Sequence, residues 1–225
     1  MRKFMVIAMA GLLALAVAGP VAAAPSVSNL SGTIATAYGE WYDGDTYGSF
    51  WAFEENGSYG SYGDVYLFEV TGTWVECAAT STKGKGGPST HDTAPGDFGF
   101  VGTRIEGYGS DIDLTFDRKM SKGVLTGHIE AYQIAVDDCA GTYDVVAEAS
   151  AELNVALPMV GPVVSRRGLE SIKVPSDFNA HRTVRGTERQ LAGAIDFGLD
   201  DIGLGSRDIE YGYAASFGWT EHANS

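Results

Sequence analysis

A two-residue alternation of apolar and polar side chains constrains this chain more than any other feature of its sequence. From Asp144 to Leu157 nearly every second residue is apolar, and polar or small residues fill most of the positions between them. Successive side chains of a β-strand point to opposite faces, so this period predicts a strand with one buried and one wet face. Its apolar face would consist of Val145, Ala147, Ala149, Ala151, Leu153, Val155 and Leu157.

The same period recurs in two other stretches, at 111–117 and near the C-terminus. In the second of these, one face would be shared by Ile209, Tyr211, Tyr213, Ala215, Phe217 and Trp219. Further strands are expected at 30–38, 48–54, 64–77, 98–107, 124–136, 179–187 and 192–198, and no long amphipathic helical period is present. We therefore predict an all-β fold, either a single antiparallel β-sandwich or a closed β-barrel of roughly nine or ten strands.

Short polar segments predict how some of these strands connect. Residues 117–123 are expected to form a hairpin loop, so that 111–157 becomes a three-stranded antiparallel meander. The segment 158–175 contains three prolines and two glycines. Because proline cannot donate to a strand ladder, we interpret 158–175 as a crossover loop within one β-domain that spans 24–225.

The first 23 residues have the pattern of a signal peptide. Arg2 and Lys3 precede an apolar run over 4–18, and the small residues Val21-Ala22-Ala23 follow as a cleavage site. The apolar run is shorter than the ~20 residues that span a bilayer. We predict export and a secreted or cell-surface location after cleavage.

Cysteine content and charge narrow the class of protein. Only Cys77 and Cys139 are present, and in an exported chain they are expected to form a structural disulfide. Without the leader, 13 basic residues face 29 acidic ones, a formal charge of −16. This charge argues against nucleic acid and against anionic lipid surfaces as partners. Acidic residues spread along the whole chain also argue against membrane insertion.

One acidic turn has part of the spacing of a calcium loop. Asp43 and Asp45 flank a glycine, and Glu54 follows at the offset of a closing carboxylate. The flanking residues are strand-like rather than helical, so an acidic hairpin turn is the favoured interpretation. A calcium site at Asp43 and Asp45 is the alternative, and no other cofactor is expected.

Three further sets of residues are candidate ligand-binding positions. Trp41 and Tyr59 lie in a stretch rich in aromatic residues, where ordinary loop packing over the fold is the favoured interpretation. Exposed rings that stack on sugars or contact a partner are the alternative. Arg182 and Arg185 belong to a basic segment that is polar on both strand faces, which suits either an edge strand or the wall of a polar cavity. His128 and Glu130 interrupt an otherwise apolar strand face, and a solvent-exposed pair is the favoured interpretation. The alternative is a polar cavity in which they would meet an arginine of that segment if the two strands were neighbours.

No catalytic motif is present, and no residue is assigned a catalytic role. We therefore expect a non-enzymatic exported domain that binds a small molecule, a glycan or a protein. The alternatives are a hydrolase or lyase acting on extracellular polysaccharide, and a porin-like barrel of an outer envelope.

Overall fold

A computed structural model describes residues 28–58, 60–78, 97–174 and 178–224, and within these ranges the chain is all-β. The only helical element in this part of the chain is a single 3₁₀ turn. The elements are β1 (Ser28–Asp43), β2 (Thr46–Gly57), β3 (Gly60–Glu76), β4 (Phe98–Ser110), β5 (Asp113–Phe116), β6 (Gly123–Asp137), β7 (Thr142–Leu157), β8 (Met159–Val174), β9 (Phe178–Leu191), β10 (Gly193–Ile195), η1 (Asp200–Ile202), β11 (Arg207–Ile209) and β12 (Tyr211–Asn224).

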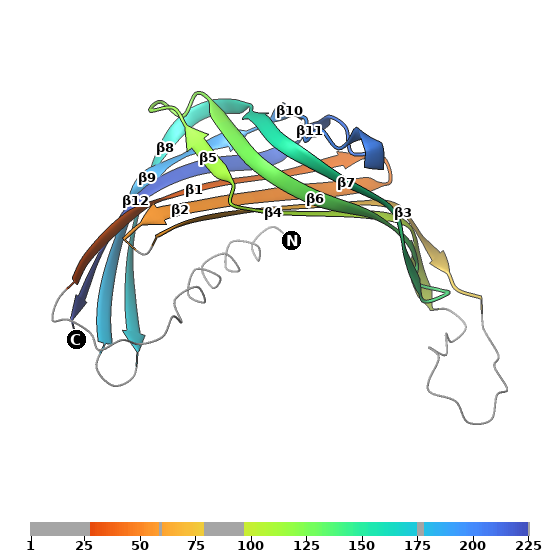
Figure 1. Ribbon diagram of the computed structural model, residues 1–225, viewed down its shortest axis with the longest axis horizontal. Helices are drawn as coiled ribbons and strands as arrows, with labels where there is room; N and C mark the ends of the chain where they lie inside the picture. The colour runs from red at the N-terminus through yellow and green to blue at the C-terminus, as the bar shows by residue number, and fades with distance from the viewer. Residues whose placement is uncertain (1–27, 59, 79–96, 175–177, 225) are drawn as a thin grey trace.

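Ten strands form one antiparallel sheet that curls into a half-barrel (Figure 1). Its strand order is β5-β6-β4-β3-β2-β1-β12-β9-β8, and β7 pairs with β6. Of the strands in the described ranges, β10 and β11 alone lie outside it, as a separate two-stranded sheet. The all-β prediction is thus confirmed, while the sandwich and the closed barrel stay predictions.

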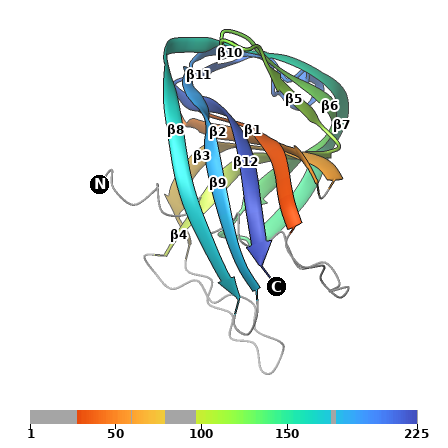
Figure 2. The same ribbon diagram turned by 90° about the vertical axis from the view of Figure 1, so that its left-hand side faces the viewer.

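The chain passes directly from one side of this sheet to the other. β7 pairs with β6 and ends at Leu157, and after the single residue Pro158 the chain continues as β8, which pairs with β9 (Figure 2). The interpretation of 158–175 as a crossover loop is therefore wrong, because residues 159–174 form β8. A proline fits here because the β8–β9 register shifts between Val160 and Val164, so the missing N–H of Pro162 lies where the ladder is interrupted.

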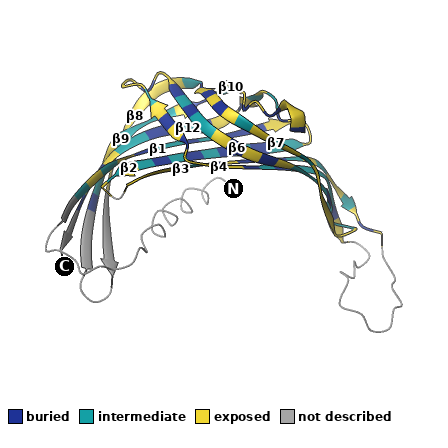
Figure 3. Cartoon of the chain, in the orientation of Figure 1, coloured by how far each residue is buried: buried dark blue, intermediate teal, exposed yellow. Residues whose placement is uncertain are grey.

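The core lies on one side of the curled sheet, which we call the inner face. Alanine, valine, leucine and phenylalanine side chains from this face are almost fully buried, and buried and exposed residues alternate along the strands (Figure 3). Two segments outside the long strands cover these buried side chains. Ile112, Leu114 and Met120 come from around β5, and Phe197, Leu199, Ile202 and Leu204 come from the segment around η1.

Two local predictions are confirmed. β5, β6 and β7 form the expected antiparallel meander, and the Asp117 N–H donates to the Lys122 carbonyl within its first loop. Cys77 and Cys139 form a disulfide with their Cα atoms 5.2 Å apart, which joins the end of β3 to the turn between β6 and β7.

Two residues lie on the opposite face from the one that the alternation predicted. A bulge skips one residue of β7, so Val145 lies opposite Ile134, while Ala147 lies opposite Gln133. Val145 is consequently exposed, with 55% of its surface accessible. Ile209 ends β11 and is buried in the core, whereas Tyr211 begins β12 on the other face. A break in regular pairing resets which face a side chain occupies.

Candidate functional site

The outer face of the sheet, turned away from the core, carries exposed aromatic side chains. Nine aromatic residues of the described chain are exposed, and the strand registers place all nine on this face: Tyr42, Tyr62, Tyr66, Trp74, Phe98, Tyr108, Tyr132, Tyr143 and Tyr211. Scattered exposed hydrophobic residues are common, but their concentration on one face of a protein marks a binding surface.

Five aromatic residues form a row that crosses five adjacent strands of this face, and we call it the aromatic row. Each member lies directly opposite the next: Tyr213 (β12), Tyr38 (β1), Trp51 (β2), Tyr66 (β3) and Tyr108 (β4). Neighbouring strands lie about 4.8 Å apart, so four strand spacings give a row about 19 Å long. The two rings at the β3–β4 end of the row are exposed, Tyr66 by 42% and Tyr108 by 56%, whereas the other three are partly buried.

Carboxylates and ring contacts restrict the orientation of the rings in the row. The hydroxyl of Tyr108 donates to Asp64 at 3.0 Å, and the hydroxyl of Tyr38 donates to Glu40. The ring centroids of Tyr38 and Tyr213 are 5.9 Å apart with an interplanar angle of 37°. Tyr38, Tyr108 and Tyr213 are therefore each held from the hydroxyl end or by a neighbouring ring, which restricts the orientation of their ring faces.

The same surroundings keep the tyrosine hydroxyls protonated. Burial raises the pKa of Tyr213 to about 12. Burial, followed by the hydrogen bond to Glu40, raises the pKa of Tyr38 above its usual range. The hydrogen bond to Asp64 raises the pKa of Tyr108. All three groups therefore remain neutral hydrogen-bonding groups over the physiological pH range.

The inner face carries a small cavity beside β5. It has a volume of about 210 Å³ and is lined by Thr33, Ile34, Ala35, Glu54, Asn56, Leu114, Thr115, Phe116 and Ser216. Glu54 is only 7% exposed, accepts the backbone N–H of Leu114 at 2.5 Å and also accepts the amide of Asn56. This carboxylate joins β2 to β5, so a structural role accounts for it.

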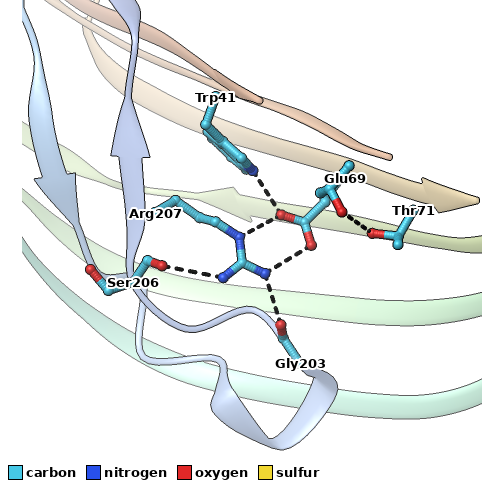
Figure 4. A network of polar contacts seen from close by, with 7 residues as sticks. Trp41, Glu69, Thr71, Gly203, Ser206 and Arg207 are labelled. Atoms are coloured by element: carbon cyan, nitrogen blue, oxygen red, sulfur yellow. Dashed lines mark hydrogen bonds and ion pairs between the residues drawn. The ribbon is translucent and has the colours of Figure 1, made fainter. Parts of the chain in front are cut away.

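A second buried carboxylate, Glu69, joins the sheet to the segment around η1 (Figure 4). Its Oε2 accepts Trp41 Nε1 at 2.7 Å and Arg207 Nε at 2.7 Å, and its Oε1 accepts Arg207 Nη2 at 3.0 Å. Arg207 also donates to the carbonyls of Gly203 and Ser206. No sequence pattern points to this cluster, because Glu69 and Arg207 are 138 residues apart.

His128 and Glu130 do not meet the arginines of the basic strand. Both residues are exposed on the outer face of β6, and His128 Nδ1 lies 3.0 Å from Glu152 Oε1 on β7. Five strands separate β6 from β9, which carries Arg182 and Arg185. The condition for a shared pocket, that the two strands be neighbours, is therefore not met, and both residues are solvent-exposed instead.

Arg182 and Arg185 lie on opposite faces of β9. Arg182 is buried on the outer face, where its Nε is 3.3 Å from Glu221 and its Cζ lies 4.4 Å from the centre of the Trp219 ring. Arg185 is exposed on the inner face and lines a cavity of about 430 Å³. β9 pairs on both sides, so its interpretation as an edge strand is wrong.

The other residues that the sequence suggested as ligand-binding or calcium-binding positions do not form a site in the described part of the chain. Trp41 is a core residue, 1% exposed, rather than an exposed stacking ring. Tyr59 lies outside the described residues. Asp43 and Asp45 are exposed at the hairpin turn between β1 and β2, and the described residues contain no group of three potential metal ligands.

Comparisons with protein-family models, with curated proteins and with solved structures give no match for this chain. Within its described part, no helix combines the length and the apolar character needed to cross a bilayer. The function must therefore be argued from the geometry of the two faces.

Proposed function

We propose that this chain is an exported, non-enzymatic binding protein whose aromatic row holds a neutral polysaccharide. The observation that carries the proposal is the row itself, five aromatic side chains in register on five adjacent strands of the outer face. Its placement away from the core leaves the rings of Tyr66 and Tyr108 open to a ligand.

The chemistry of a sugar chain suits this row. The apolar C–H face of a pyranose packs on an aromatic ring, while its hydroxyls need hydrogen-bond partners at the ring edges. The row offers both, because tyrosine hydroxyls and nearby carboxylates such as Asp64 accompany the rings. The spacing of about 4.8 Å between strands is comparable with the length of one hexose unit in an extended chain.

Charge selects among polysaccharides. Carboxylates surround the row on the same face, namely Glu40, Asp64, Glu106 and Glu130, and the whole chain has a formal charge of −14. A polyanionic sugar would be repelled by this field, whereas a neutral polymer would not. The row is therefore expected to prefer glucans or chitin over alginate or heparin.

The leader sequence and the disulfide support a place outside the cytoplasm, where such polymers occur. Disulfides form and persist in oxidising compartments, and Cys77 and Cys139 are bonded. His128 lies beside Glu152 on the exposed outer face and lines neither of the two cavities described above, so this geometry gives the alternative of a polysaccharide hydrolase or lyase no specific support.

A binding assay with matched variants tests the proposal. The mature, disulfide-bonded protein is incubated with insoluble cellulose, chitin and β-glucan, and with an alginate gel as the anionic comparison. Tyr66→Ala and Tyr108→Ala remove the two open rings of the row. Tyr143→Ala is the control, since Tyr143 has nearly the same exposure, 57% against 56% for Tyr108, but lies outside the row.

We expect retention of the parent protein on at least one neutral polymer and a loss of affinity of about 3- to 10-fold in each row variant, equivalent to about 1 kcal/mol per ring. The control should bind like the parent. No retention on any neutral polymer, or an equal loss in Tyr143→Ala, would overturn the proposal. Retention on alginate alone would overturn the charge argument and with it the choice of ligand.

A further inference from the structure

The inner face of β8, β9 and β12 is basic and rich in hydroxyl groups, in contrast to the acidic chain as a whole. The strand registers place these described residues on it: Ser165 and Arg167 of β8, Thr183, Arg185, Thr187 and Arg189 of β9, and Ser216, Gly218 and Thr220 of β12. None of them is a carboxylate. Nearly twice as many acidic as basic residues occur in the sequence, 29 against 15, so a basic surface without acidic residues is unusual here.

Arg167 and Arg185 lie directly opposite each other across the β8–β9 pair, and both are exposed. Like charges in this position repel and destabilise a sheet. Among the described residues, neither arginine has a hydrogen bond or an ion pair. Other arginines on these strands do: Arg166 bonds Glu188 at 3.0 Å, and Arg182 bonds Glu221 at 3.3 Å.

A cavity of about 430 Å³ adjoins this arginine pair. It is lined by Thr183, Arg185, Gly218, Trp219 and Thr220. Thr183 and Thr220 face each other across the β9–β12 pair, and Gly218 lies opposite Arg185. Because Gly218 has no side chain, the space beside the Arg185 guanidinium stays open, and a Cβ there would meet only the Arg185 carbonyl at 3.9 Å.

We propose that this surface is a binding site for a sulfate, phosphate or carboxylate group. The planar guanidinium groups of Arg167 and Arg185 would each present paired N–H donors to the oxygens of the anion, and the hydroxyls of Thr183 and Thr220 would supply further donors. A bound anion turns the repulsion between the two arginines into a shared attraction. The site is on the opposite face from the aromatic row and does not depend on the glycan proposal.

The experiment titrates the mature protein with sodium sulfate and sodium phosphate at constant ionic strength, with chloride as the balancing salt. Binding is followed by two-dimensional NMR and by thermal unfolding. A second arm uses a short sulfated oligosaccharide, which distinguishes a free anion from an anionic group on a larger molecule. The variants are Arg167→Gln and Arg185→Gln, and Arg166→Gln is the control because it neighbours Arg167 on the outer face.

We expect sulfate or phosphate to shift the backbone signals of 183–185 and 218–220 and to raise the Tm of the parent protein. Each test variant should weaken anion binding by about tenfold, whereas Arg166→Gln should not. Arg185→Gln should also raise the Tm in chloride alone, since it removes the repulsion, and a merely structural arginine would not show this effect. The proposal is overturned if neither anion arm gives saturable shifts at these residues, or if Arg166→Gln weakens binding as much as the test variants.

Discussion

Replacing Glu69 by alanine should release the segment around η1 from the sheet. The carboxylate is 4% exposed and holds both Trp41 Nε1 and the Arg207 guanidinium. Its loss leaves the buried Trp41 N–H without an acceptor, which costs about 1–3 kcal/mol. It also breaks the ion pair with Arg207, whose side chain is 23% exposed. Breaking a fully buried pair typically costs about 3–5 kcal/mol of stability, and because Arg207 is partly solvated we expect a cost near or below the lower end of that range.

Together these losses predict that Glu69→Ala lowers the free energy of unfolding by about 3–4 kcal/mol. Urea denaturation with the disulfide intact measures this change. Native-state hydrogen exchange should show faster exchange in 193–209 than in the central strands, because only that segment loses its attachment. Glu188→Ala is the control, since it breaks the more exposed ion pair with Arg166 and should cost no more than about 1 kcal/mol.

A double-mutant cycle isolates the ion pair itself. Glu69→Ala and Arg207→Ala should be strongly non-additive, because each single change already removes their shared contact. A loss below 1 kcal/mol in Glu69→Ala, or additive effects in the cycle, would refute the idea that this carboxylate anchors the segment.

Three other properties can be measured on the same protein. The pKa of Tyr213 is raised to about 12, so the contribution of this tyrosine to stability is complete below pH 10 and is lost as the pH rises toward 12. Ultraviolet titration of tyrosinate should find a group that ionises late and that is removed by Tyr213→Phe. Reduction of the disulfide, which spans 62 residues, should lower the free energy of unfolding by up to about 4 kcal/mol, and an unchanged urea midpoint in reductant would contradict this. Gly48→Ala should destabilise by about 1–3 kcal/mol, because its Cβ would lie 2.1 Å from Trp41 Cε2; Gly168→Ala, with nothing within 4 Å, is its control.

Most of the local structure could be predicted from the sequence. Alternation at 144–157 predicted β7, the polar loop after Phe116 predicted the hairpin to β6, and the two cysteines allowed only one pairing. Each of these features depends on neighbouring residues or on simple counting. The prediction of local structure failed at β8, where the prolines concealed a strand whose ladder is interrupted near Pro162. It also failed at Val145, where a bulge changes the face that the side chain occupies.

The candidate sites depend on register, which the sequence did not supply. Tyr38, Trp51, Tyr66 and Tyr108 become one row only when four strands align residue by residue. A shift of one residue in any strand would move its ring to the other face. In the same way Arg167 meets Arg185 only through the β8–β9 register, and Glu69 meets Arg207 only after the η1 segment folds back.

The position of β12 has a consequence for the order in which the molecule can assemble. β12 lies between β1, the first described strand, and β9, and it is the only strand through which the β8–β9 hairpin pairs with the rest of the sheet. Among the described strands, β1 therefore has β2 as its only partner until residues 211–224 are available for pairing. The free edge of β1 is open to pairing with other chains throughout that time. We therefore expect the pairing of β12 with β1 and β9 to be a late step of high contact order, and this step should limit the folding rate.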